Sequence, residues 1–572
     1  MRFSPIPVFL FCFVLSTLTG FTSAAEDSAR VYTVFKNLEA KYADKLEELA
    51  KWCDEKGLDG QAETTRNWAK PVEPDDEIRV SPLPDQFQEW NQKGKAAPAK
   101  TSMAKDSKSD KSAKSGSKSK SKSKKDGKRS RSSGDDDDDA AGNDSSAPFG
   151  EWGTGITDDG TVLPPKDPKL VAEWENQFRM IRLNASKDYL KLAKKAVSTG
   201  HVTFGFGLLM RTLREDPDCE AARKILGYSK TKTGWVTDFE KMQMKMGNVW
   251  HETYGWIPKK FVQKYEDGQR YLNGKWVTAE QDAEYHSTIE RGWVVLTGHF
   301  EIITDASLEA GVQTGKKLEQ MYRVWKQLFL NYYATEQQIR SLFETGSAKF
   351  TPIPRHRVLL FKTSEEYVSY LTSKNMYTPG SAGVYVHRRS GKKREGAACF
   401  SADSHDDHTM YHEVTHQLFE ESCETAPGKG SKQNYWVVEA ASTFMESFHE
   451  AEDGTLAVGG FNSSRMKGAR IYAVNMDQFI PFEEFVLVTG SKWSEKLRND
   501  YYCEACGMAN FLVFYDHGRY RDVFGRMLFD VYSGRDTKES LTKLTGADWE
   551  TLNREYKEYI SQDADAIKGY SF

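Results

Sequence analysis

Cysteine is scarce in this chain, with seven residues among 572. Cys12 lies in an apolar N-terminal stretch, and the other six are too thinly spread to form a disulfide scaffold. An even number suits an oxidising compartment but allows fifteen pairings, so the sequence assigns no disulfide. Cys503 and Cys506 could be a redox pair or a second zinc site. We favour buried small residues or disulfides to Cys399 or Cys423.

Long apolar runs are also missing, apart from one near the N-terminus. Arg2 precedes the apolar stretch 7–15, and residues 22–25 (Thr-Ser-Ala-Ala) offer small side chains for cleavage. Such a stretch is too short to cross a membrane but is typical of a signal peptide, which we assign to residues 1–25. The sequence therefore predicts an exported protein, periplasmic or extracellular, with no transmembrane segment in the mature chain.

The chain lacks a strong excess of charge of either sign, because its formal net charge is −4. This balance argues against a specific nucleic-acid partner. Charge is segregated locally, since residues 101–132 hold twelve Lys or Arg against three Asp, and aspartates fill 135–139. Almost no apolar residue accompanies them, so residues 100–147 are predicted to be a disordered linker. Its basic part could bind an anionic polymer of the cell envelope, although we favour a solubilising spacer.

The linker divides the chain into predicted domains. Residues 26–99 carry an apolar stripe among many Glu and Lys and are predicted to form a helical segment. Residues 148–290 are predicted to be helical too, with one helix pair that resembles a tetratricopeptide unit and is too little for a solenoid. Gly-Trp turns recur there about every twenty residues, at Gly234, Gly255 and Gly274. Their aromatic rings could bind sugars or peptides, but we favour a role in pinning short strands together.

Residues 412–416 read His-Glu-Val-Thr-His, a pattern typical of zinc hydrolases. Two histidines four apart share one face of a helix, so both imidazoles can bind one Zn²⁺. Glu413 would then reach a water in the open coordination position and remove its proton. The stretch 409–419 contains no Gly or Pro, and Asp406 or Asp407 offers an N-cap, so a helix is predicted here.

A second predicted helix, at 436–446, offers a carboxylate as the third ligand. Glu439 follows His416 by twenty-three residues, with a loop rich in Gly, Lys and Ser between the two helices. Two histidines and one glutamate leave a position for water, which is the catalytic arrangement of zinc. The candidate ligands are therefore His412, His416 and Glu439. His408 shares the helix face and could touch a second metal or the substrate, but we favour a solvated first-turn residue.

These motifs resemble those of gluzincin metallopeptidases, in which HExxH is followed by a Trp-x-x-Glu helix. The similarity covers about residues 292–565, within a domain that we assign to 291–572, and is greatest to peptidase-MA-like domains of secreted bacterial proteins. It extends to the predicted strands 299–304 and 357–361 and to the Tyr-containing helix at 502–512.

The resemblance implies a multi-domain α+β protein with mostly helical N-terminal regions. Its C-terminal domain would be thermolysin-like, with a small mixed sheet ahead of the site helix and helices after it. We predict that residues 395–401 form the edge strand of that sheet. An extended peptide could bind along such an edge by strand addition.

The resemblance also implies a role for each site residue. Glu413 is expected to be the general base, and Tyr502 to donate to the oxyanion, with Tyr501 as the open alternative. Ala440 and Thr443 depart from the family pattern. Thr443 stands where some gluzincins carry an acidic residue that orients a ligand histidine, so this support must come from elsewhere. The Gly-x-Met-Glu-Asn stretch of the aminopeptidase branch is missing, which favours an endopeptidase.

The sequence thus predicts an exported zinc metallopeptidase that hydrolyses peptide bonds in a peptide or protein substrate, and residues 26–147 are a candidate propeptide. Two alternatives stay open. One is a catalytically inactive metallopeptidase fold that serves as a binding or scaffold protein of the cell envelope. The other is a scaffold that acts through the helical regions and the linker, with a purely structural zinc.

Overall fold

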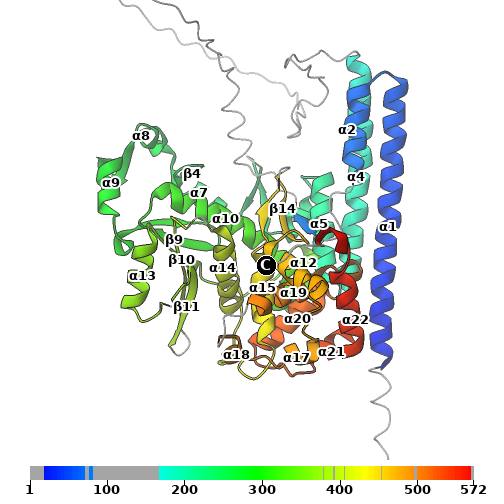
Figure 1. Cartoon of the computed structure of the whole chain (residues 1–572). Helices are drawn as coiled ribbons and strands as arrows, with labels where there is room; N and C mark the ends of the chain where they lie inside the picture. Colours follow the sequence, from blue (N-terminus) through cyan, green and yellow to red (C-terminus); the bar gives the residue numbers. More distant parts are fainter. Residues whose placement is uncertain are drawn as a thin grey trace, which may run out of the picture. The chain divides into compact units, whose positions relative to one another are not determined.

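The described residues before and after the charged linker belong to a single unit. In the computed structural model (Figure 1), the described residues are 18–70, 77–80 and 167–567, except residues 233, 378, 391–392, 405, 452–453 and 495–498. The apolar core of the predicted signal peptide and the predicted linker at 100–147 lie outside the described residues.

The N-terminal part of the unit is a helical bundle. It contains α1 (Leu18–Glu55), α2 (Asp59–Ala69), α4 (Pro168–Ser198) and α5 (Val202–Glu215). Helix α4 begins at a strong N-cap, because the Asp167 carboxylate accepts from the Lys169 amide at 2.9 Å and Pro168 occupies the first turn. Both α1 and α2 pack against α4, so helices that precede the linker lie beside a helix that follows it (Figure 1).

A buried carboxylate joins these helices. Glu215 is 4% exposed and accepts hydrogen bonds from the Tyr42 hydroxyl at 2.6 Å and from Trp68 Nε1 at 3.0 Å. Arg182 Nε lies 3.1 Å from the same carboxylate. A buried carboxylate is stable only when charge and hydrogen bonds satisfy it. The native bundle therefore needs partners from both sides of the linker.

The Gly-Trp turns lie in consecutive β-hairpins, each followed by a short helix. Trp250 pairs with Trp256 across one hairpin, with ring centroids 5.9 Å apart, and Tyr271 pairs with Trp276 across the next, at 5.2 Å. The aromatic rings thus hold their own strands together. The elements are α6 (Glu220–Ile225), β2 (Tyr228–Thr231), β3 (Gly234–Thr237), α7 (Asp238–Lys245), β4 (Asn248–His251), β5 (Gly255–Pro258), α8 (Val262–Glu266), β6 (Gln269–Leu272), β7 (Lys275–Thr278) and α9 (Ala279–Tyr285).

A five-stranded mixed sheet follows, with the strand order β11-β12-β10-β9-β8. Strands β9, β10 and β12 are parallel, and the outer strands β8 and β11 are antiparallel to their neighbours. The strands are β8 (Trp293–Leu296), β9 (Phe300–Thr304), β10 (His356–Phe361), β11 (Gly383–Ser390) and β12 (Lys393–Ser401).

The prediction that residues 395–401 form the edge strand is wrong, because β12 lies between β10 and β11. Ala398, Cys399 and Phe400 are buried, as expected for a strand with a neighbour on each side. The outer strand on this side of the sheet is β11, which pairs with β12.

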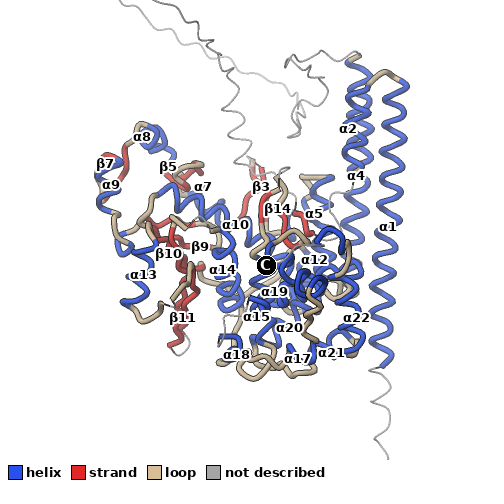
Figure 2. The backbone as a smooth tube through the Cα atoms, viewed as in Figure 1, coloured by secondary structure: helices blue, strands red, loops and turns tan. Residues whose placement is uncertain are grey.

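Helices dominate the chain after this sheet, so the protein is α+β (Figure 2). A small sheet with the order β1-β14-β13 interrupts them. Strand β1 (Glu77–Val80) and strand β13 (His449–Glu450) each pair antiparallel with β14 (Leu456–Gly459). The helices that matter for the site are α14 (Asp407–Ser422), α15 (Tyr435–Met445), α16 (Ser464–Arg470), α18 (Gly490–Ser494) and α19 (Asn499–Gly518).

Across residues 18–70, 77–80 and 167–567, as far as they are described, no helix combines the length and apolar character that spanning a bilayer requires.

Candidate metal centre

The His-Glu-Val-Thr-His stretch lies on α14, and the predicted helix is confirmed. The Asp406 side chain accepts from the amides of His408 at 3.0 Å and Thr409 at 3.3 Å, which makes Asp406 the N-cap. Val414 and Leu418 are fully buried, so one face of α14 is held in the core. The histidines occupy a neighbouring face that turns toward α15.

Three ligand atoms from α14 and α15 converge. The Nε2 atoms of His412 and His416 are 3.1 Å apart, and Glu439 Oε2 lies 3.4 Å from the first and 3.6 Å from the second. Zinc–nitrogen bonds of about 2.0–2.1 Å require ligand atoms about 3.3 Å apart at the corners of a tetrahedron. The observed spacings match that requirement, so these residues fit one Zn²⁺.

Glu439 offers a second sign of fit. Glu439 is 4% exposed. Its Oε2 atom is buried and has no hydrogen-bond partner among the described residues. A buried carboxylate oxygen left in this state is costly, and a cation at the point between the two imidazoles would satisfy it.

Polar side chains on α15 and just beyond it orient both imidazoles through their other ring nitrogen. His412 Nδ1 lies 2.7 Å from Glu446 Oε1, and His416 Nδ1 lies 3.1 Å from the Ser442 hydroxyl. A proton on each Nδ1 leaves the Nε2 lone pairs free for a metal. The second oxygen of Glu446 is 3.0 Å from Arg465 Nε.

Sequence reasoning missed Ser442 and Glu446, although a signal was present. Glu439, Ser442 and Glu446 are spaced i, i+3 and i+7, which places them on one helix face. Thr443, at the position that is acidic in some gluzincins, donates its hydroxyl to the Glu439 carbonyl at 2.8 Å. Support for the candidate ligand His412 therefore comes from one turn further along the chain.

The carboxylates control the protonation of this cluster when no metal is bound. Burial lowers the pKa of His412, but the neighbouring carboxylates of Glu439 and Glu446 outweigh burial and raise it to about 10. Burial raises the pKa of Glu439, whereas the charges of the two histidines lower it far below its usual range. The metal-free site is thus a carboxylate that holds a protonated imidazole, and a bound metal must displace that proton.

Glu413 follows His412 directly on α14 and also contacts the sheet. Its Oε2 accepts from the main-chain N–H of Tyr385 on the edge strand β11 at 2.8 Å. The Tyr385 hydroxyl donates to Glu421 Oε1 at 3.1 Å, and Glu421 Oε2 is 2.5 Å from Nδ1 of the buried His356. Two carboxylates on α14, two turns apart, therefore hold β11 in place.

Of the two adjacent tyrosines, Tyr502 is the one beside the cluster. Its ring lies 6.3 Å from the His412 ring, whereas Tyr501 packs on Phe485 at 5.4 Å and Trp493 at 5.3 Å. Burial and the charge of Glu439 raise the pKa of Tyr502 to about 12. The phenol therefore keeps its proton at neutral pH and can donate a hydrogen bond.

A further tyrosine, Tyr435, was not anticipated from the sequence. It begins α15, one turn before Glu439, and its hydroxyl hydrogen-bonds that carboxylate. The charge of Glu439 and burial together raise the pKa of Tyr435.

Comparison with known proteins adds no relative to this picture. No protein-family model matches the chain, and a search of curated proteins finds no match. The arrangement of the side chains therefore carries the functional argument.

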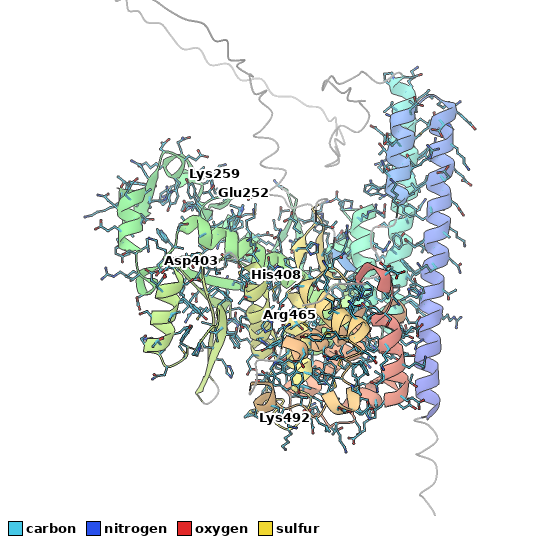
Figure 3. The ribbon with its side chains drawn as sticks, in the orientation of Figure 1. Glu252, Lys259, Asp403, His408, Arg465 and Lys492 are labelled. Atoms are coloured by element: carbon cyan, nitrogen blue, oxygen red, sulfur yellow. The ribbon has the colours of Figure 1, made fainter. Side chains whose placement is uncertain are left out.

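The remaining candidates lie outside the cluster. His408 is exposed, and its Nδ1 is 2.6 Å from the Glu446 carbonyl oxygen (Figure 3). The cysteines of the described chain, Cys503 and Cys506 included, are free thiols. Cys503 and Cys506 are also buried, which agrees with the interpretation of this pair as small packing residues.

Proposed function

We propose that this chain is an exported zinc-dependent metallopeptidase of the gluzincin type. It binds its substrate along β11 and hydrolyses internal peptide bonds. The observation that carries the proposal is the convergence of His412 Nε2, His416 Nε2 and Glu439 Oε2, all within 4.8 Å of one another. Their donor set, two neutral imidazoles and one carboxylate, is that of catalytic zinc.

Each residue of the site would have a distinct role in the reaction. His412, His416 and Glu439 would hold the ion, which when bound supplies a Lewis acid that polarises the scissile carbonyl. Glu413, next to the first ligand, would take a proton from the attacking water and pass it to the leaving nitrogen. Tyr502 would donate to the carbonyl oxygen as negative charge develops on it.

The position of β11 supports a peptide substrate. β11 is an outer strand of the sheet, and its Tyr385 N–H reaches Glu413 directly. An extended peptide that paired with this edge would pass beside the proposed base. The missing N-terminus-binding stretch of the aminopeptidase branch supports an endopeptidase rather than an exopeptidase.

Two measurements test the proposal. Elemental analysis of the purified mature protein should find near-stoichiometric zinc that is lost in His416→Ala. Cleavage of a peptide library by the wild type should then be abolished in Glu413→Gln, which keeps the shape of the side chain. Two results would point instead to the inactive binding fold. In the first, the protein binds zinc but wild type and Glu413→Gln cleave peptides equally. In the second, it binds zinc and neither protein cleaves peptides.

A further inference from the structure

Arg465 contacts both halves of the proposed active site. Its Nε lies 3.0 Å from Glu446 Oε2, while the other oxygen of that carboxylate is 2.7 Å from His412 Nδ1. The guanidinium is therefore one carboxylate away from a metal ligand. Arg465 (Figure 3) is on the first turn of α16. Ser463 caps this helix, and Met466 is buried in the core.

The same guanidinium also reaches the helix that carries Tyr502. Arg465 Nη1 donates to Asn499 Oδ1, at the first residue of α19, at 2.7 Å. The Cζ atom of Arg465 lies 5.2 Å from the centre of the Tyr502 ring, within cation–π range. Asn499 and Tyr502 are three residues apart and lie on the same turn of α19. Arg465 therefore holds this turn at two points, by a hydrogen bond to Asn499 and by a cation–π contact with Tyr502.

This arrangement differs from an ordinary surface ion pair, which contributes little. The Glu446 side chain is 13% exposed and that of Arg465 31%, so solvent screens the pair only in part. Arginine suits the position because its planar guanidinium donates in fixed directions to two separate acceptors while its flat face lies on a ring, and an ammonium group has no flat face.

We infer that Arg465 is a positioning residue that sets the orientations of His412 and Tyr502 together. It acts on His412 by holding the Glu446 carboxylate, and on Tyr502 by holding the first turn of α19. This inference rests on the proposed function and deepens it, because it links metal affinity to the placement of the oxyanion donor. Loss of Arg465 should weaken both.

Zinc affinity of the full-length protein tests the first half. Competition with a chromophoric chelator is measured for the wild type, Arg465→Met, Arg465→Lys and Glu446→Gln, with Lys467→Met on an exposed position of α16 as the matched control. Arg465→Met and Glu446→Gln should each weaken binding about tenfold, and their combination no further, since both act through one contact. The zinc affinity of Arg465→Lys should lie between those of the wild type and Arg465→Met. If Arg465→Met does not fold, Arg465→Lys is the variant that tests the inference.

Kinetic coupling tests the second half. kcat and KM for peptide cleavage are measured at saturating zinc for Tyr502→Phe, Arg465→Met and the double variant. If Arg465 places the Tyr502 hydroxyl, Tyr502→Phe lowers kcat by a smaller factor in the Arg465→Met background than in the wild type. Losses in kcat that simply multiply would overturn the link to Tyr502.

The outcomes separate the two proposals. If the wild type binds zinc and cleaves peptides but Arg465→Met keeps full zinc affinity, the role of Arg465 is overturned and the proposed function stands. A wild type that binds no zinc removes the proposed function, and the role of Arg465 with it.

Discussion

The main-chain N–H of Tyr385 donates to Glu413 Oε2 across 2.8 Å, so the outer strand of the sheet holds the proposed general base. The Tyr385 hydroxyl fixes the strand in this position through Glu421. Tyr385→Phe keeps the N–H but removes the second contact. We expect kcat to fall by roughly threefold to tenfold, less than the 10²-fold that full misplacement can cause, with zinc content unchanged.

Steady-state kinetics and elemental analysis check this expectation. Tyr377→Phe, which removes a tyrosine hydroxyl from the loop after α13 (Ser364–Ser373), serves as the control. Unchanged kcat in Tyr385→Phe would show that the N–H alone suffices to orient Glu413.

Tyr502 and Tyr501 offer a matched pair for the oxyanion donor. Tyr502→Phe should lower kcat by about 10²-fold to 10³-fold with little change in KM, because the hydrogen bond forms mainly in the transition state. Tyr501→Phe should retain most activity, since Tyr501 packs on Phe485 and Trp493 away from the His412 ring. Similar losses in both variants would indicate a packing effect of the α19 turn.

Zinc affinity should rise with pH. In the metal-free protein His412 has a pKa of about 10, so at neutral pH zinc must displace its proton. The affinity should therefore increase by up to about tenfold per pH unit between pH 7 and 9 and fall as the solution is acidified. Isothermal titration in buffers of different ionisation enthalpy measures the released proton. A pH-independent affinity over this range would contradict a protonated His412.

Glu504 should make the fold less stable as the pH rises from the ordinary glutamate range to about 8. It is 3% exposed, and burial raises its pKa to about 8. Between the ordinary glutamate pKa and 8 the folded protein holds a proton that the unfolded chain has released. Stability is thus greatest below the ordinary pKa and falls by about 1.4 kcal/mol per pH unit until pH 8 is passed.

Glu504→Gln mimics the protonated side chain and should remove this slope. Its melting temperature should exceed that of the wild type at pH 8 and approach it at pH 5. Glu550→Gln, an exposed glutamate on α22 (Trp549–Ile560), is the control and should leave the pH profile unchanged. Parallel profiles for wild type and Glu504→Gln would mean that Glu504 is ionised in the folded protein.

After proteolytic cleavage within the charged linker, the two fragments should stay associated. Glu215, after the linker, is bonded to Tyr42 and Trp68, before it, and β1 pairs with β14. Limited trypsin treatment should cut the lysine-rich segment first and yield fragments that co-elute on size exclusion. Fragments that separate without denaturant would instead support the interpretation of residues 26–147 as a removable propeptide.

Local patterns determined much of the candidate site. The spacing of His412 and His416, the lack of Gly and Pro around them and the capping aspartate specify a helix with two imidazoles on one face, because helix geometry depends on nearby residues only. The loop length before Glu439 allows a second helix to return a carboxylate. These features were predicted, and the structure brings the three residues together.

Tertiary structure decided what depends on distant neighbours. Residues 395–401 could be recognised as a strand, but only the pairing of β12 with both β10 and β11 shows that the edge lies elsewhere. Arg465 and Glu446 meet because α15 and α16 both pack on α19, and no spacing along the chain encodes that contact. Strand order and ion pairing are set by non-local packing, whereas helix faces are set by the repeat of the helix itself.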